Sequence, residues 1–214
     1  MHTLIIFAHP VEGTFPHAVL QAFVRGIEDN PGTTAEIVDL HQEGFDPRFT
    51  QADHAHFWGE PLPTEIAVEH ARVDRSDALV FIFPVYWWGM PALMKGWLDR
   101  VLTGGWAWSV DPQATSRGLL KNRPTLILAT GGSRKATYEK YGYDNAMKAQ
   151  LEVGTFAYCG LTDVESHYFL DVEGEANAER RHLYLKTAEN LGRAFTSPDR
   201  TSKCIHQGSV RLSG

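Results

Sequence analysis

The distribution of hydrophobic residues predicts a chain in which strands and helices alternate. Short, continuous apolar runs indicate strands that are buried on both faces, because a half-exposed strand would alternate apolar and polar residues. Strands are predicted at 1–8, 35–40, 78–84, 125–130 and within 162–170. Helical periodicity is found between or after them, at about 18–27, 65–75, 90–102, 145–158 and 175–195.

This alternation predicts an α/β fold with a doubly wound, five-stranded parallel sheet and helices on both faces. We expect one domain over 1–195, a polar tail over 196–214, and a polar, histidine-rich excursion over 41–63 that is mostly at the surface. With strand order 2-1-3-4-5, ligands bind at the carboxyl ends of the strands, in the loops after strands one, three and four.

Composition narrows the function classes. With 214 residues, 43% of them hydrophobic, and 21% charged, the chain is expected to fold as one domain. A net charge of −6 without a Lys/Arg run argues against nucleic acid as a partner. Cys159 and Cys204 fit no disulfide or zinc pattern, and the cluster of His41, Asp53, His54 and His56 matches no metal motif, so no metal is expected.

The sequence also contains no apolar stretch of the length that crosses a membrane, and no basic leader with a cleavage site. We therefore expect a cytoplasmic protein with no membrane insertion.

Two of the three ligand-binding loops contain residues suited to a planar ring. The loop after 78–84 places three adjacent aromatic residues between prolines, in the run Pro84-Val85-Tyr86-Trp87-Trp88-Gly89-Met90-Pro91. The loop after 125–130 contains Gly131 and Gly132, whose amides can approach a ligand closely. The alternatives are that the tryptophans plug the end of the sheet and that the glycines only form a turn.

The loop after the first strand offers a phosphate site. Thr14 and Phe15 stand where a helix begins, and free N–H groups at a helix N-terminus favour an anion. The alternative is that Thr14 only caps the helix. The sequence lacks both GxGxxG and GxxxxGK[ST], so a phosphate next to a planar ring indicates a flavin.

The segments 7–10, 14–15, 83–101 and 130–132 resemble the DT-diaphorase-like NAD(P)H:quinone oxidoreductases. The resemblance implies a flavodoxin-like fold, a homodimer with active sites at the interface, FAD as cofactor with FMN as the alternative, and NAD(P)H as co-substrate. It assigns the phosphate end of the flavin to His9, Thr14, Phe15, His17 and Ala18. It assigns the ring to Pro84, Val85, Tyr86, Trp87, Trp88, Thr130, Gly131 and Gly132.

The same resemblance implies catalytic roles. The amides of Gly131 and Gly132 would donate to the reduced flavin. Tyr138 matches a tyrosine that in this family assists proton and charge movement together with a histidine. No histidine lies between His70 and His167, and Tyr141 or Tyr143 are the alternatives to it.

Substrate would stack on Trp87 and Trp88, while Trp108 and Tyr158, by matched position, would reach into the partner subunit's pocket. Trp106 and Trp108 also favour a dimer, because tryptophans exposed to solvent are costly in a monomer.

The expected activity is hydride transfer from NAD(P)H to a quinone by a ping-pong mechanism, as in an NAD(P)H dehydrogenase (quinone). An alternative from another class is a regulatory subunit that docks on a membrane potassium-efflux transporter through the acidic surface or the 41–63 excursion. A one-electron flavodoxin shuttle is disfavoured, because the aromatic loop suits substrate stacking.

Overall fold

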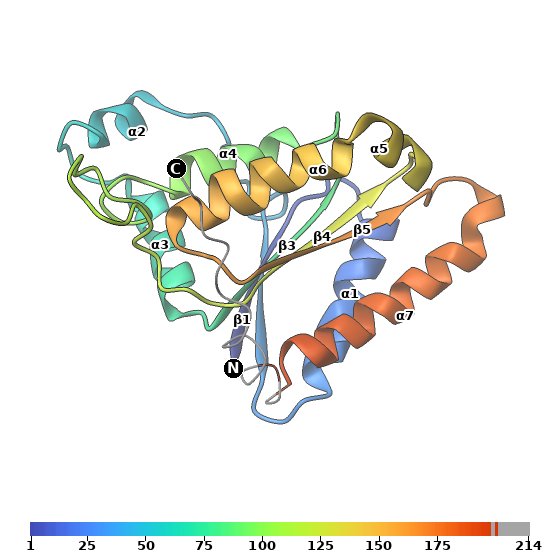
Figure 1. Ribbon diagram of the computed structural model, residues 1–214. Coiled ribbons are helices and arrows are strands. Elements are labelled where there is room, and N and C mark those ends of the chain that lie inside the picture. The colour runs from blue at the N-terminus through green and yellow to red at the C-terminus, as the bar shows by residue number, and fades with distance from the viewer. Residues whose placement is uncertain (198–199, 201–214) are drawn as a thin grey trace.

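The computed structural model describes residues 1–197 and 200, and its centre is a five-stranded sheet of parallel strands. The strand order is β2-β1-β3-β4-β5, as the sequence predicts (Figure 1). The strands are β1 (His2–Phe7), β2 (Thr34–Asp39), β3 (Ala78–Pro84), β4 (Thr125–Gly131) and β5 (Val164–Leu170). Every residue of β3 and β4 is buried, which explains why these strands are continuous apolar runs.

Helices cover both faces of the sheet (Figure 1). One face carries α1 (Phe15–Glu28) and α7 (Ala178–Phe195), which pack against each other along their length. The other carries α3 (Thr64–Arg75), α4 (Ala92–Val101) and α6 (Tyr143–Lys148), which continues into the π-helix η1 (Ala149–Phe156). The shorter helices are α2 (Gln51–His56), α5 (Lys135–Tyr141), and the 3-10 turns η2 (Ala157–Cys159) and η3 (Glu175–Asn177).

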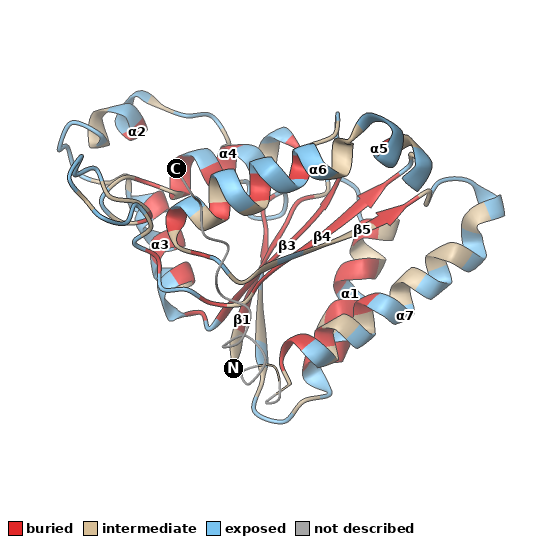
Figure 2. Ribbon diagram, viewed as in Figure 1, coloured by how far each residue is buried: buried red, intermediate tan, exposed pale blue. Residues whose placement is uncertain are grey.

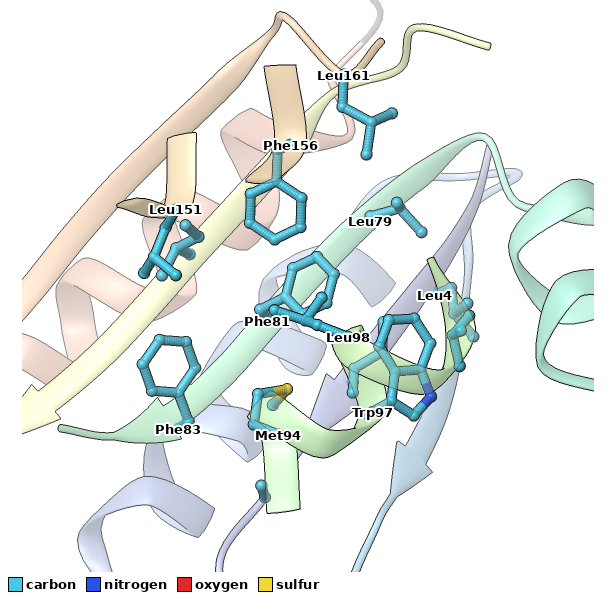
Figure 3. Packing of buried hydrophobic residues seen from close by; sticks show 14 of the residues in the cluster. Leu4, Leu79, Phe81, Phe83, Met94, Trp97, Leu98, Leu151, Phe156 and Leu161 are labelled. Carbon is cyan, nitrogen blue, oxygen red and sulfur yellow. The ribbon is translucent and has the colours of Figure 1, made fainter. Parts of the chain in front are cut away.

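The core on the α4 side is built around Phe81 of β3 (Figure 3). Its ring lies 5.9 Å from that of Trp97 and 4.8 Å from that of Phe156, measured between centroids. Figure 2 shows that the buried positions run through the strands and along the helix sides that face them. Cys159 lies in this core, and burial raises the pKa of its thiol to about 11.

The 41–63 excursion lies mostly at the surface, as predicted, but it also contains α2 and one buried residue, Asp53. Thr50 and Asp53 form a reciprocal capping box at the start of α2. Asp53 is buried and accepts a 2.9 Å hydrogen bond from Arg100 of α4, which is 2% exposed. Hydrophobic periodicity misses this anchor, since it depends on charge.

At the other end of the chain, Thr196 is buried and its hydroxyl accepts a hydrogen bond from Asn30, so packing continues to this residue. Most of the tail predicted for 196–214, namely residues 198–199 and 201–214 with Cys204, lies outside the described residues. Within the described ranges, no helix is long and apolar enough to cross a membrane, and no group of His, Cys, Asp and Glu could hold a metal ion.

Candidate active site

The loop after β3 has a strained backbone. Tyr86 and Gly89 exchange two backbone hydrogen bonds of 3.0 and 3.1 Å, which closes a two-residue turn around Trp87 and Trp88. Both tryptophans have positive φ, 49° and 60°, where such turns normally place Gly, Asn or Asp. Residues held in this region cost about 1–3 kcal/mol each, and such strain concentrates at ligand sites.

The two indoles of this turn have different surroundings. Trp87 is 95% exposed. Trp88 is half-buried and stacks on Tyr143 with ring centroids 3.8 Å apart. The turn therefore presents one open aromatic surface beside a packed one, and the tryptophans do not plug the sheet end as a pair.

The glycine loop lies directly beside the aromatic turn. The Val85 amide donates a 2.7 Å hydrogen bond to the Thr130 carbonyl, which joins the two loops where Pro84 pairs with Thr130 in the sheet. A Cβ placed on Gly131 would lie 3.1 Å from Leu170 Cδ2 and from the Tyr138 hydroxyl oxygen. The predicted proximity of the two loops is confirmed, and a side chain on Gly131 would press on Leu170 and Tyr138.

The loop after β5 completes this edge, which sequence reasoning missed. The Val172 amide donates to the Gly131 carbonyl, and the Glu173 carboxyl lies 2.5 Å from where a Cβ on Gly132 would stand. No motif marks Glu173, because it reaches the site only through the pairing of β4 with β5.

Tyr138 of α5 lies beneath the aromatic turn. Its side chain is 2% exposed, and its ring centroid lies 5.3 Å from that of Trp88 and 6.4 Å from that of Tyr168. Burial, and secondarily Tyr168, raises the pKa of Tyr138 to about 12, so the phenol stays protonated and can donate a hydrogen bond. Tyr143 is stacked on Trp88, and Tyr141 is 58% exposed.

At the carboxyl end of β1, Thr14 binds two histidines instead of capping α1. Its hydroxyl oxygen lies 3.1 Å from Nδ1 of His9 and 3.1 Å from Nδ1 of His17. It makes no side-chain cap, and the first turn of α1 contains no acidic residue. Phe15 and Ala18 belong to the same turn, so all five residues predicted for the phosphate end lie together. The simple capping alternative for Thr14 is wrong.

Trp108 and Tyr158 lie at the opposite edge of the sheet, in segments that precede β4 and β5. Their ring centroids are 6.2 Å apart, and Trp108 also lies 6.1 Å from Phe57. The seven residues of β4 span roughly 20 Å between this edge and Gly131. These two residues therefore do not join Trp87 and Trp88 within one chain.

The expectation that Trp106 is exposed to solvent is wrong. Its ring stacks on His70 with centroids 3.6 Å apart, and its indole N–H donates to Asp74. The strongly exposed tryptophans are Trp58, at 80%, and Trp87. The sequence could not separate these cases, because His70 covers Trp106 from another helix.

A pocket of about 540 Å³ opens between the loop after β1, the segment 40–47 and the aromatic turn. Its walls are mostly apolar and include Ala8, Leu40, Phe45, Tyr86 and Leu93. The loops after β1 and β3 thus border this cavity, whereas the loop after β4 does not line it.

Comparisons with known proteins agree with this geometry. The family model for the flavodoxin-like fold matches residues 1–191. A protein of Haemophilus influenzae named as an uncharacterized NAD(P)H oxidoreductase is 33% identical, over 92% of this chain and 97% of its own. The structure of an NAD(P)H:quinone oxidoreductase from Methanothermobacter marburgensis superposes with a TM-score of 0.83 at 30% identity, covering 92% of this chain and 98% of that one.

A third similar protein is the general stress protein 14 of Treponema denticola, solved in complex with FMN. Its TM-score is 0.63 at 25% identity, and the match covers 92% of this chain and 100% of that one. The chain therefore belongs to the flavodoxin-like-fold family and, within it, to the NAD(P)H:quinone oxidoreductases.

Proposed function

We propose that the chain is a flavin-dependent enzyme that transfers a hydride from NAD(P)H to a quinone. The observation that carries the proposal is the joined pair of loops, in which the bare backbone of Gly131 lies beside the strained turn of Trp87 and Trp88. Backbone strain concentrates at ligand-binding sites, and the exposed indole in this turn offers a surface on which a planar molecule can stack.

The residues present fit a flavin. Backbone amides without side chains can reach a ring edge at Gly131 and Gly132, and the uncapped start of α1 with His9 and His17 suits the phosphate end. A bound flavin would supply the two-electron acceptor and donor chemistry. We propose FAD, with FMN as the alternative, which the FMN bound to the Treponema denticola protein supports. Mass analysis of the extracted cofactor decides between them.

Each residue of the site has a defined task in this proposal. The amides of Gly131 and Gly132 would donate to the ring where negative charge accumulates, and loss of one such donor costs about 3 kcal/mol. Tyr138, protonated because of its raised pKa, would donate a hydrogen bond to the quinone oxygen as charge develops. The exposed Trp87 offers a stacking surface to nicotinamide and quinone.

We propose a ping-pong order, because the described residues offer one aromatic surface for two planar substrates. Nicotinamide would leave this surface before quinone stacks in the same place. Initial rates measured at several quinone concentrations test the order. Parallel double-reciprocal lines are expected, and intersecting lines would require both substrates to be bound together.

We propose a homodimer in which a second copy completes the pocket. Trp108 and Tyr158 are one strand length from Gly131 in their own chain, so only another chain could bring them to it. They belong to a patch with exposed aromatic residues at its surface, namely Phe49, Phe57 and Trp58. Exposed apolar patches of this kind are typical of protein interfaces.

A further inference from the structure

The start of α1 contains two imidazoles arranged around one hydroxyl group. The Val11 amide lies 3.2 Å from Nδ1 of His9 and donates to it, while the Val11 carbonyl lies 2.9 Å from the same nitrogen. The first contact suits a ring with an unprotonated Nδ1, and the second suits a ring with a proton on Nδ1, so the two contacts fit different tautomers of His9.

Thr14 has a single hydroxyl proton and faces Nδ1 of both rings. That proton has a third acceptor, because the hydroxyl also donates to the Val11 carbonyl at 3.0 Å, and the hydroxyl oxygen can accept from an Nδ1 that carries a proton. In the described part of the chain, Nε2 of His9 and Nε2 of His17 have no hydrogen-bond partner. Thr14 thus engages both rings through Nδ1 and leaves two imidazole nitrogens available at an uncapped helix start.

The surroundings of His17 act on its pKa in both directions, and the net effect is to lower it. Burial, followed by His9, lowers the pKa of His17, while Asp39 and Glu12 act in the opposite direction. Asp39 is engaged with the amides of His41 and Gln42, and Glu12 accepts from the Gln42 side chain.

A second pocket lies beside His17 and Asp39, and two further charged residues border it, each with a partner of opposite charge. Arg25 pairs with Glu189, and Glu43 pairs with Arg72. Among the described residues that line this pocket, Arg25 is the one basic residue besides His17, and it lies 3.8 Å from the Glu189 carboxylate.

We propose that His9 and His17, oriented by Thr14, take up protons when the phosphate of the flavin binds, so that flavin affinity falls as pH rises. This inference rests on the proposed function and adds to it that the affinity for the flavin depends on pH. An imidazolium donates a charge-assisted hydrogen bond to a phosphate oxygen, whereas a neutral ring donates a weaker one. The sign follows from linkage, because binding that takes up protons weakens as protons become scarce.

The test measures flavin release by fluorescence when the flavin-loaded protein is diluted at pH 6, 7 and 8. We expect the dissociation constant of FAD or FMN to rise about tenfold over this range in the natural protein, the effect of one pKa unit of coupling. Riboflavin, which has no phosphate, should bind with little pH dependence. FMN titrates on its own, so the decisive quantity is the difference between the natural protein and each variant.

Variants His17→Asn and, independently, His9→Asn should flatten the pH dependence. Thr14→Val should flatten it in part, and Thr14→Ser, which keeps the hydroxyl, should restore it. The matched control is His41→Asn, which removes an exposed histidine from a neighbouring loop and should leave the dependence unchanged.

Three outcomes would overturn the inference. Flavin that binds with the same pH dependence in both histidine variants as in the natural protein would refute this inference alone. The inference would also be refuted if the affinity for riboflavin depended on pH as strongly as the affinity for FAD, because the titrating group would then act on the flavin ring and not on the phosphate. Failure to bind any flavin at any pH would refute the proposed function, and this inference with it.

Discussion

The hydroxyl oxygen of Tyr138 lies 3.1 Å from the position that a side chain on Gly131 would occupy. The Tyr138 side chain therefore fills the space beside Gly131. Its phenol, whose pKa is raised to about 12, lies next to a residue without a side chain. Two predictions follow from this contact, one for each residue.

A side chain at Gly131 should remove the flavin. Gly131→Val places carbon atoms against the buried side chains of Tyr138 and Leu170, so the loop proposed to hold the ring must shift. We expect protein that is folded by circular dichroism but colourless, and Gly131→Ala should retain part of the flavin. The absorbance of purified protein near 450 nm measures this. Full flavin content in Gly131→Val would show that this loop does not hold the ring.

Loss of the Tyr138 hydroxyl should slow the reduction of quinone. Tyr138→Phe removes one hydrogen bond to developing charge, worth roughly 1.5–3 kcal/mol, so the step should slow by about tenfold to a hundredfold. Stopped-flow reoxidation of the reduced enzyme by quinone measures it. The control is Tyr141→Phe, at an exposed ring, which should have little effect. An unchanged rate in Tyr138→Phe would exclude this residue from the mechanism.

The pH profile of that step should also be flat near neutrality in the natural protein. The phenol of Tyr138 stays protonated well above pH 9 because its pKa is raised, and no histidine lies between His70 and His167. A titration near pH 6–7 in flavin reoxidation, still present in the His9 and His17 variants, would contradict this expectation.

Charge on the exposed aromatic patch should separate the subunits. Trp58 is 80% exposed, so Trp58→Glu should fold normally but place a carboxylate in the proposed interface. Light scattering should then give a monomer with reduced activity. Leu183→Glu, at a 56% exposed residue of α7 on the other face of the sheet, is the matched control and should remain dimeric (Figure 1). A dimer in Trp58→Glu would place the interface elsewhere.

The ion pair that anchors the excursion should matter for stability. Arg100→Ala leaves the Asp53 carboxylate buried without its partner, which typically costs about 3–5 kcal/mol in the free energy of unfolding. Arg48→Ala, which breaks an exposed pair with Asp46, should change little. Urea unfolding of both variants measures the difference, and equal midpoints would contradict the prediction.

This ion pair also has a pH signature. Burial acts to raise the pKa of Asp53, but hydrogen bonds from Arg100 and Thr50 together hold it below its usual value. The stabilisation is therefore complete above the ordinary aspartate range and is lost as pH falls through the lowered value. Arg100→Ala should accordingly remove part of the acid sensitivity of the natural protein.

The sequence alone determined the parallel sheet, and the resemblance to a family of flavodoxin-like fold implied the order of its strands. The runs at 78–84 and 125–130 are apolar without interruption, and only a parallel sheet covered on both faces buries such strands completely. The same periodicity, with the parallel topology, placed Trp87, Gly131 and Thr14 at the carboxyl edge. The sequence is enough for this placement, because each of these loops comes directly after its strand along the chain.

Tertiary structure alone decided what those residues contact. Glu173 reaches Gly132 through strand pairing, His70 covers Trp106, and Arg100 makes Asp53 a buried residue. Helix α5 has only one buried residue, Tyr138, so no apolar repeat predicts it. These contacts join residues far apart in the chain, and hydrophobic periodicity records which side of an element is buried but not which side chain will cover it.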